Sequence, residues 1–462
     1  MSDAASAFHF FIATFGCKVS QYESQALREH WVRQGGRETD EPRLADVILI
    51  ASCAVTAEAV ADARQAARKW GREVPGARIV VTGCAASAEP GDFCLPGVTA
   101  VVPQNLKANL LSVHPLELDG EKCRDFAMPC RPEKGRDAQG TAKPERKPDG
   151  FLPFRIEGFR RARPVLKVQD GCSHGCSYCI VPLTRGPSCS RPPAETVDEA
   201  RRLLKAGHRE IMVSGINLRQ YYAEGQNFWG LLRRLNRELA PEWQGRARLR
   251  LSSLEPAQLD AEGLETLEAC SLLCPHLHLS LQSGSPAVLR RMGRQSNPER
   301  VLDAMDRVRG FWPVFGLGAD ILMGFPRESE SEVRETLDIV QSLPLTYAHV
   351  FPWSSRPGTT AATMPGALPK AERQEHAARV RALIAGKHAT FLDAQSTLPD
   401  FVFAGDGNGG SRGINEYYAP CRLEEGVIMA EGHELLPVRP VDVKDGHLLC
   451  RPLRLAKARD LS

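Results

Sequence analysis

The sequence lacks any uninterrupted apolar run of the roughly 20 residues that a helix needs to cross a bilayer, so a membrane protein is not expected. Its first residues, MSDAASAFHFFIATFGC, have no basic segment and no long apolar segment, which argues against a secretory signal. An excess of one charge is also missing, because the net charge of +3 is too small to establish a nucleic-acid partner. We therefore expect a soluble, cytoplasmic protein whose cysteines serve metal binding and not crosslinks.

Cysteine, in contrast, is plentiful, at 14 of 462 positions. Three cysteines stand in one short segment, Cys172-Ser-His-Gly-Cys176-Ser-Tyr-Cys179. A [4Fe–4S] cluster held by three cysteines leaves one iron open, and this CxxxCxxC spacing is the one that radical S-adenosylmethionine (SAM) enzymes use to bind their cofactor. The alternative is a zinc knuckle with Cys176 and Cys179 as one ligand pair and Cys172, His174 or Cys189 as the remaining ligands. Zinc prefers paired CxxC segments, however, and the sequence has no second one.

Residues 1–113 alternate short strands with helices. Strands are predicted at 9–14, 45–50 and 77–81, and helices at 23–34 and 57–70. The βαβαβ order favours an open parallel sheet. Each predicted strand is followed by a cysteine, namely Cys17, Cys53 and Cys84. Because the carboxyl ends of parallel strands meet at one edge, we expect these thiolates to converge on a second, auxiliary [4Fe–4S] cluster. The alternative is that they are small buried residues at strand ends.

Residues 161–385 repeat strand and helix units. Strands are predicted at 164–168, 210–214, 248–252, 276–280, 315–323 and 347–351. Six such units indicate a partial (β/α) barrel, in which the chemistry lies at the carboxyl ends of the strands. Polar clusters follow several of these strands and contain Ser214, Gly215, Ser252, Glu255 and Gln282. Capping of ordinary barrel turns is the alternative role of these residues.

The remaining segments have weaker patterns. Residues 114–160 are predicted to form a linker, because most of them are charged, proline or glycine without apolar periodicity. The basic residues Arg160, Arg161, Arg163 and Lys167 follow, with Phe154 and Phe159 nearby. Basic and aromatic side chains together grip phosphates and stack on bases, although a solvated strand beside the barrel is an alternative. Short β-like runs in 390–462 predict a small β-barrel, in which acidic residues outnumber basic ones.

Four segments resemble the methylthiotransferase family of radical SAM enzymes. They are Phe15-Gly-Cys17-Lys-Val-Ser-Gln-Tyr-Glu-Ser24, Ala51-Ser-Cys53-Ala-Val-Thr56, Val81-Thr-Gly-Cys84, and Val168-Gln-Asp-Gly-Cys172 with its two partners. The form of the first segment and Arg250-Leu-Ser-Ser-Leu-Glu-Pro256 look most like the branch that acts on N6-threonylcarbamoyladenosine at position 37 of tRNA. The branches acting on N6-isopentenyladenosine 37 of tRNA, and on an aspartate of ribosomal protein S12, are the near alternatives.

The resemblance implies a radical mechanism with two [4Fe–4S] clusters and SAM. Cys172, Cys176 and Cys179 would hold the cluster that cleaves SAM to a 5′-deoxyadenosyl radical, which removes the C2 hydrogen of the adenine. The auxiliary cluster at Cys17, Cys53 and Cys84 would present the methylated sulfur. By the same resemblance, SAM is bound by Tyr178, Ser214, Gly215, Ser252, Glu255 and Gln282.

The family also suggests the partners of the protein. They are the tRNA anticodon loop, gripped by Arg160, Arg161, Arg163 and Lys167, an external electron donor of the flavodoxin or ferredoxin type, and a sulfur donor. The small barrel corresponds to the RNA-binding TRAM domain, and we expect a monomer. The chain departs from the family pattern at Ser20, at Ala51-Ser52 and at Ala86 or Ser87. These positions all lie near the auxiliary cysteines in the sequence, so the departures bear on how the auxiliary cluster is tuned.

A hypothesis from another class is an RNA-binding protein with a redox-sensing iron–sulfur cluster and no catalysis. The two cysteine triplets discriminate between the hypotheses, because a sensor needs one labile cluster and not two open ones on separate domains.

Overall fold

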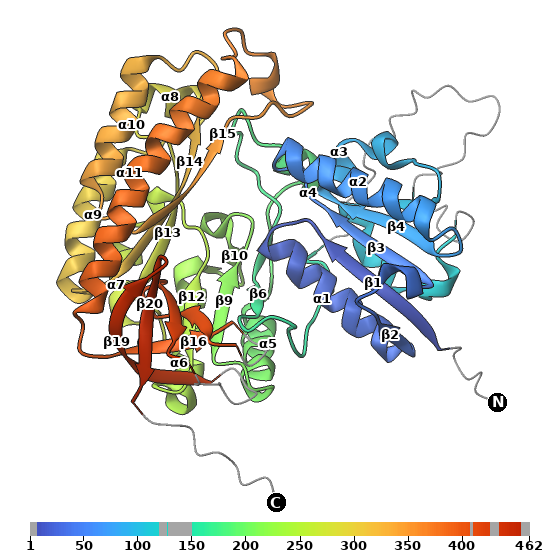
Figure 1. Cartoon of the computed structure of the whole chain (residues 1–462), viewed down its shortest axis with the longest axis horizontal. Coiled ribbons are helices and arrows are strands. Elements are labelled where there is room, and N and C mark those ends of the chain that lie inside the picture. The colour runs from blue at the N-terminus through green and yellow to red at the C-terminus, as the bar shows by residue number, and fades with distance from the viewer. Residues whose placement is uncertain (1–6, 120–126, 128–149, 407–409, 426–433, 454–462) are drawn as a thin grey trace, which may run out of the picture. The chain divides into compact units, whose positions relative to one another are not determined.

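The computed structural model describes residues 7–119, 127, 150–406, 410–425 and 434–453. The chain divides into two compact units (Figure 1). Unit 1 comprises Met1–Glu157, Gln169–Ser190 and Ser354–Ala362, and unit 2 comprises Gly158–Val168, Arg191–Trp353 and Thr363–Ser462. Much of the predicted linker, at 120–126 and 128–149, lies outside the described residues. Within the described ranges, no helix is long and apolar enough to cross a membrane.

Unit 1 is built on a five-stranded sheet in the order β2-β1-β3-β4-β5 (Figure 1). The strands are β1 (Phe8–Thr14), β2 (Gly36–Glu38), β3 (Val47–Ser52), β4 (Arg78–Gly83) and β5 (Val98–Pro103). Every neighbouring pair is parallel, which confirms the open parallel sheet predicted from the βαβαβ order. The two outer strands, β2 and β5, extend the three strands that the sequence pattern indicated.

Successive side chains of a strand point to opposite faces, and β1 shows how each face is covered. Phe10 packs on Trp31 of α1 (Lys18–Arg33), with ring centroids 5.4 Å apart. The next residue, Phe11, packs on Trp70 of α2 (Ala57–Glu73), with centroids 5.2 Å apart. The two helices therefore cover opposite faces of the sheet.

Short elements complete unit 1. They are α3 (Cys84–Ala88), α4 (Val181–Arg185), β7 (Gln169–Asp170), β8 (Cys189–Ser190), and the 3-10 turns η1 (Pro42–Leu44), η2 (Pro90–Phe93), η3 (Gln104–Leu111) and η4 (Pro115–Glu117). The strands β7 and β8 pair antiparallel and join the two ends of the segment that contains Cys172, Cys176 and Cys179. This pairing makes the cysteine segment a closed loop.

Unit 2 contains the predicted partial (β/α) barrel. Its strands are β6 (Val165–Lys167), β9 (Glu210–Ser214), β12 (Arg248–Leu251), β13 (His276–Gln282), β14 (Gly316–Met323) and β15 (Tyr347–Pro352). They form two three-stranded parallel sheets, β12-β9-β6 and β13-β14-β15, linked by the parallel bridges Leu249–Leu273 and Leu254–Leu279. These strands confirm the six that the sequence predicted.

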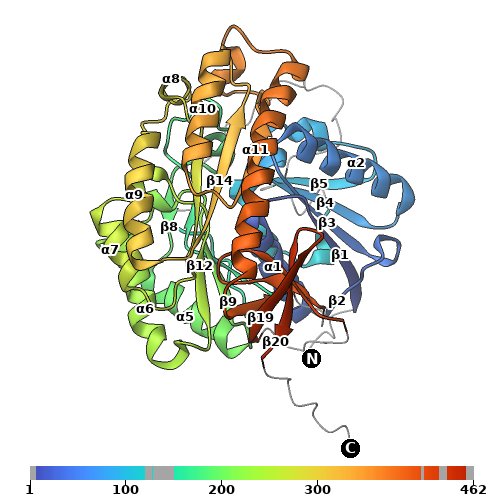
Figure 2. The same cartoon turned by 60° about the vertical axis from the view of Figure 1, so that its left-hand side comes forward.

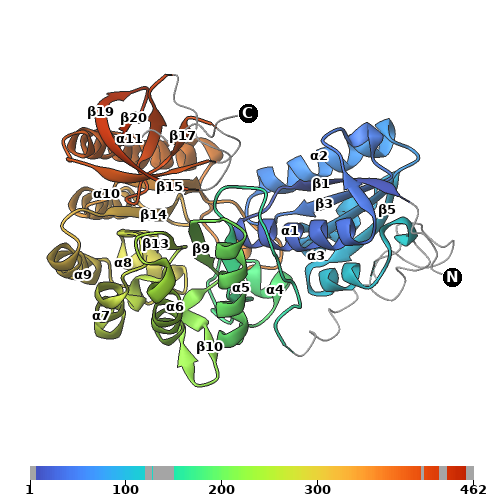
Figure 3. The same ribbon diagram turned by 90° about the horizontal axis from the view of Figure 1, so that it is seen from below.

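Helices cover the outer side of the barrel strands (Figure 2 and Figure 3). They are α5 (Pro193–Lys205), α6 (Phe228–Trp243), α7 (Ala261–Ala269), α8 (Pro286–Arg291), α9 (Pro298–Phe311) and α10 (Glu330–Ser342). The connections carry η5 (Leu218–Gln220), β10 (Tyr222–Ala223), β11 (Gln226–Asn227) and η6 (Pro256–Gln258), whereas most of η7 (Thr360–Thr363) belongs to unit 1. Each barrel strand before β15 is thus followed by at least one helix before the next parallel strand, as the barrel requires.

The long helix α11 (Lys370–Ser396) leads to a closed β-barrel of β16 (Phe401–Gly405), β17 (Arg412–Ile414), β18 (Pro420–Leu423), β19 (Leu435–Lys444) and β20 (His447–Pro452). The small C-terminal barrel is therefore confirmed. Its interior is apolar and centred on Phe403, Cys421 and Leu448.

Buried charges join the two barrels of unit 2. Glu210 accepts hydrogen bonds from Arg248 Nε at 2.6 Å and Arg250 Nε at 2.7 Å, and Arg250 also donates to the carbonyl oxygens of Asn415 and Glu416, both at 3.0 Å. Burial alone would raise the pKa of Glu210, but the two arginines lower it to about 2. Glu210 is therefore ionised at neutral pH and pairs with both guanidinium groups.

Candidate metal centres

The three N-terminal cysteines lie at the same edge of the unit 1 sheet. Cys53 directly follows β3, Cys84 directly follows β4 and begins α3, and Cys17 precedes the first residue of α1, three positions after β1 ends. The strands β1, β3 and β4 are adjacent and parallel, so their carboxyl ends meet. The structure therefore brings together the three cysteines that the sequence pattern predicted to converge.

The electrostatics of these thiols reflect their closeness. Burial raises the pKa of Cys53 to about 11, and negative charge on Cys84 and Cys17 raises it further. Burial also raises the pKa of Cys84. Metal ligation needs thiolates, and a bound cation deprotonates a coordinating thiol outright. Two buried thiols, Cys53 and Cys84, with the exposed Cys17 at the same sheet edge suit a multivalent metal group better than they suit separate apolar packing.

The backbone between β3 and β4 is shaped for this close approach. Gly83 has φ +105°, and a Cβ added there would lie 2.3 Å from the carbonyl oxygen of Ser52, its register partner on β3. The Ser52 hydroxyl donates to the Thr82 carbonyl oxygen at 2.7 Å and accepts from the Ala86 amide at 3.1 Å. Ser52 therefore fixes the turns that carry Cys53 and Cys84, because its hydroxyl donates one hydrogen bond and accepts another there.

The loop that carries Cys172, Cys176 and Cys179 is also fixed by its backbone. The Cys172 amide donates to the Gly186 carbonyl oxygen at 2.9 Å, and the Cys179 amide donates to the Cys176 carbonyl oxygen at 3.1 Å. The His174 amide donates to Cys172 Sγ at 3.4 Å. Hydrogen bonds to the cysteine sulfurs are among the contacts that tune the reduction potential of an iron–sulfur cluster. The donor set therefore fits a cluster at this loop.

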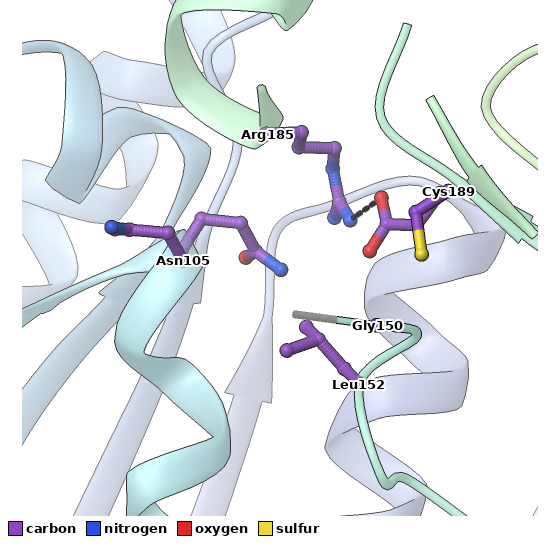
Figure 4. Close-up of a pocket in the computed structure, with 7 residues that line it drawn as sticks. Asn105, Gly150, Leu152, Arg185 and Cys189 are labelled. Carbon is purple, nitrogen blue, oxygen red and sulfur yellow. Dashed lines mark hydrogen bonds and ion pairs between the residues drawn. The ribbon is translucent and has the colours of Figure 1, made fainter. Parts of the chain in front are cut away.

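A buried charge cluster, consisting of Glu23, Lys107, Asp170 and Arg185 with Gln104, was not predicted from the sequence. Glu23 accepts from Lys107 Nζ at 3.0 Å, from Gln104 Nε2 at 3.0 Å and from Arg185 Nη1 at 2.9 Å. Arg185 Nη1 also donates to Asp170 Oδ1 at 2.9 Å (Figure 4). Two acids and two bases compensate one another, which makes their burial tolerable.

Arg185 connects this charge cluster to the cysteines. Burial alone would lower its pKa, but negative charge on Glu23, Cys84, Asp170 and Cys17 holds the pKa well above its usual value. The neighbouring Thr184 side chain, like Arg185, opposes the rise in the pKa of Cys84 that burial causes. Both residues belong to α4, which follows the cysteine loop within two residues of Cys179. The segment after one cysteine triplet thus supplies polar partners to the other.

A small pocket of about 30 Å³ opens beside Arg185 (Figure 4). Its lining includes Asn105, Leu152, Asp170 and Cys189. A space of this size holds about one water molecule, so it does not hold SAM or a nucleoside. Gln104, Asp170 and Arg185 of the charge cluster also line it, which places the pocket beside that cluster.

The remaining predicted cofactor residues, apart from Tyr178, lie in unit 2 at the carboxyl ends of barrel strands. Ser214 ends β9, Gly215 follows it, Ser252 follows β12, and Gln282 ends β13 with a φ of +66° that non-glycine residues rarely adopt. The Ser252 hydroxyl is buried and finds no hydrogen-bond partner among the described residues. This orphaned group fits a polar ligand at the strand ends.

Two further placements bear on the predicted cofactor site. Glu255 begins η6 and pairs with Arg294, which also donates to the Ser280 carbonyl oxygen at 2.8 Å. Tyr178 lies in the cysteine loop of unit 1 and is partly buried. Sequence reasoning missed Arg294, whose position 39 residues from Glu255 gives no local pattern.

Comparison with known proteins agrees with the two cysteine-bearing regions. The radical SAM superfamily model matches residues 166–340, and the model described as uncharacterized protein family UPF0004 matches residues 9–96. The threonylcarbamoyladenosine tRNA methylthiotransferase MtaB of Bacillus subtilis (strain 168) is 32% identical over 382 residues, which cover 82% of this chain and 80% of the relative. The chain belongs to the radical SAM methylthiotransferase family.

This methylthiotransferase has relatives with different named substrates. The tRNA-2-methylthio-N(6)-dimethylallyladenosine synthase of Roseobacter denitrificans is 30% identical over 455 residues, covering 95% of this chain and 97% of that protein. Among solved structures, the radical SAM methyltransferase TsrM from Kitasatospora setae matches with a TM-score of 0.55 at 16% identity, over 77% of each chain. That likeness shows a shared fold. Family membership implies a [4Fe–4S] cluster and SAM, as predicted.

The predicted RNA-binding residues of the methylthiotransferase differ in exposure. Arg160 and Arg161 are exposed, and Arg163 is partly buried, with its Nη2 donating to Asp406 Oδ1 at 2.9 Å. Lys167 has no exposed surface, so it does not contact RNA in this structure and is removed from the set. All three residues of β6 are buried, so the burial of Lys167 follows from the position of this strand in the fold. Phe154 and Phe159 are buried as well, at 1% and 9% exposure, and are core residues.

Proposed function

We propose that this methylthiotransferase acts on tRNA and adds a methylthio group to C2 of N6-threonylcarbamoyladenosine at position 37. The observation that carries the proposal is the presence of two three-cysteine sites, one in the loop at Cys172–Cys179 and one at the sheet edge formed by Cys17, Cys53 and Cys84. Sulfur insertion by a radical enzyme needs one open site for the cofactor and another for sulfur. The Bacillus relative supports the choice of threonylcarbamoyladenosine.

The residues of the chain have separate tasks in this proposal. Bound at these sites, the two clusters would supply the electron that generates the radical from SAM and the sulfur that is transferred. The amide of His174 donates a hydrogen bond to Cys172 Sγ and so helps to fix the position of that ligand. The buried hydroxyl of Ser252 provides a hydrogen-bonding group for the cofactor at the strand ends. Arg294 holds Glu255 in one orientation, which prepares that carboxylate for a ribose hydroxyl.

Partners follow from the same proposal. The exposed Arg160 and Arg161 would contact phosphates of the anticodon stem or loop. An external electron donor of the flavodoxin or ferredoxin type and a sulfur donor would supply the electron and the sulfur. A tRNA substrate would place the enzyme in the cytoplasm.

The second candidate substrate is N6-isopentenyladenosine 37 of tRNA, which the Roseobacter relative favours through its match along nearly the whole chain. Nucleoside mass spectrometry of tRNA from a deletion strain tests the choice. Loss of the 2-methylthio group from threonylcarbamoyladenosine alone, restored by the wild-type gene but not by a Cys53→Ala copy, is the expected result. Loss from isopentenyladenosine instead would transfer the proposal to that substrate, and unchanged tRNA with an unmodified ribosomal protein S12 would overturn both.

Iron analysis separates the enzyme from a redox sensor with one cluster. After anaerobic reconstitution, two [4Fe–4S] clusters predict about eight irons per chain, and about four for a variant with Cys17, Cys53 and Cys84 all replaced by alanine. A matched control replaces Cys94, Cys270 and Cys274, which belong to neither site, and should keep about eight irons. Loss of only a fraction of one iron in the first variant would refute the auxiliary site.

A further inference from the structure

The segment Ser354–Ala362 follows the last barrel strand in sequence, yet it belongs to unit 1. The Ala361 amide donates to the Ser177 carbonyl oxygen at 2.7 Å, within the loop of Cys172, Cys176 and Cys179. Gly358 approaches α4 so closely that an added Cβ would lie 3.1 Å from Leu183 Cδ1. This segment is therefore packed against the cysteine loop and against the helix that follows it.

Arg356 is the one residue of this segment whose polar groups are not accounted for within the described part of the chain. Its side chain is buried, with 6% of the residue exposed. Nη2 donates to Ser354 Oγ at 2.8 Å, whereas Nε is buried and has no hydrogen-bond partner among the described residues. A buried guanidinium group left with an unused donor is unfavourable, because the N–H has lost water without gaining an acceptor.

The surroundings of Arg356 identify the kind of acceptor. Burial lowers its pKa, while negative charge on Glu89 and Cys53 raises it. Cys53 is one of the three convergent cysteines, and the charge of Arg185 acts on all three. Two buried arginines from distant parts of the chain thus share the surroundings of Cys53. Cluster sulfurs and anionic sulfur ligands accept hydrogen bonds from such donors, which tune iron–sulfur centres.

The two arginines are held differently. Arg185 is paired with Glu23 and Asp170, so its charge is already compensated by carboxylates. Among the described residues, the Arg356 guanidinium forms no ion pair with a carboxylate, and its Nη2 donates to the neutral Ser354 hydroxyl. Arg356 therefore contributes the less compensated positive charge to the auxiliary site.

We propose, resting on the proposed function above, that Arg356 is a positioning residue of the auxiliary cluster and donates its Nε–H to a sulfur of that cluster. A positive charge and a hydrogen-bond donor beside the cluster stabilise the reduced state, which carries one more negative charge. Arg356 thereby raises the reduction potential of the auxiliary cluster. Arg356 lies in the segment that follows the barrel. The reduction potential of the auxiliary cluster therefore depends on a part of the chain that is far in sequence from Cys17, Cys53 and Cys84.

The test uses the full-length chain with Cys172, Cys176 and Cys179 replaced by alanine, so that only the auxiliary cluster is measured. Iron is counted after anaerobic reconstitution, and the midpoint potential is determined by EPR-monitored titration with dithionite and mediators. Arg356→Gln should lower the equilibrium constant for one-electron reduction about tenfold, which corresponds to a potential about 59 mV more negative. Arg356→Lys keeps the charge and loses the Nε donor, so it should shift the potential in the same direction by less.

Arg68→Gln is the matched control, because it removes the same charge from an exposed position on α2. Its effect on the potential should be close to zero, since solvent and salt screen exposed charges. An Arg356→Gln potential equal to that of the control, with about four irons retained, overturns the inference about Arg356 alone. If Arg356→Gln does not fold, the inference is tested with Arg356→Lys. An unchanged midpoint potential in that variant overturns the inference.

The variant with Cys172, Cys176 and Cys179 replaced by alanine also separates this inference from the proposed function. If it binds no cluster even with Arg356 present, the auxiliary site itself fails, and the function proposed above fails with it. If it binds about four irons and Arg356→Gln loses them while circular dichroism shows an intact fold, the hydrogen bond is needed to hold the cluster, and the inference is supported.

Discussion

Gly83→Ala should remove the auxiliary cluster and leave the cluster of the cysteine loop in place. Gly83 ends β4, has φ +105°, and directly precedes Cys84. An added Cβ would lie 2.3 Å from the Ser52 carbonyl oxygen, whereas ordinary contact begins near 3.4 Å. The ends of β3 and β4 would have to separate by about 1.1 Å, the difference between these distances. Backbone strain at the positive φ adds about 1–3 kcal/mol.

This displacement acts directly on the ligands, because Ser52 precedes Cys53 and Gly83 precedes Cys84. Metal–ligand distances tolerate deviations of only about 0.2 Å, several times less than the required movement. Iron and acid-labile sulfide after anaerobic reconstitution should therefore fall from about eight to about four per chain.

Gly76→Ala is the matched control, because nothing lies within 4 Å of a Cβ added there. It should keep about eight irons. A Gly83→Ala protein that also binds about eight irons would show that the close approach of β3 and β4 is not required for ligation. The reasoning from strand geometry to the auxiliary site would then be wrong.

Lys107→Met should destabilise the apoprotein by about 3–5 kcal/mol, because it leaves Glu23 with one cation fewer in a buried site. Adding Glu23→Gln should recover about 0.5–3 kcal/mol in urea unfolding, and strictly additive effects would contradict a shared charge cluster. Glu210 should contribute about 3 kcal/mol above its unfolded pKa, lost as the pH falls from about 4.5 towards its folded pKa of about 2. In Glu210→Gln, acid unfolding followed by circular dichroism should no longer show this pH-dependent loss of stability. The same variant leaves Arg248 and Arg250 uncompensated at neutral pH, which lowers its stability there.

Much of the fold could be predicted because its patterns are local. The strands that end before Cys17, Cys53 and Cys84 are apolar runs closed by polar turns, and parallel topology then places their ends together. The outer strand β2 has three residues, Gly36–Glu38, too few to show the alternation that marks a strand. It pairs with β1 because the sheet offers it an open edge, and only the assembled sheet provides that edge.

Residue exposure could be predicted less well. Arg160, Arg161, Arg163 and Lys167 form one basic run in the sequence, yet Lys167 is buried while Arg160 and Arg161 are exposed. Charge in a sequence is normally solvated, so a basic run gives no indication that one member is buried. Lys167 lies in β6, which is buried along its whole length, and only the folded chain decides that burial.

The sequence alone determined where the two cysteine triplets of this methylthiotransferase stand. Three cysteines within eight residues predict a three-ligand loop whatever surrounds them, and cysteines after neighbouring parallel strands predict a second site by topology. The tertiary structure decided the electrostatics of those sites. Glu23 and Arg185 are 162 residues apart, and Arg356 reaches the surroundings of Cys53 only after the barrel is complete. Such buried pairings depend on which charges folding desolvates together, and no local pattern records that choice.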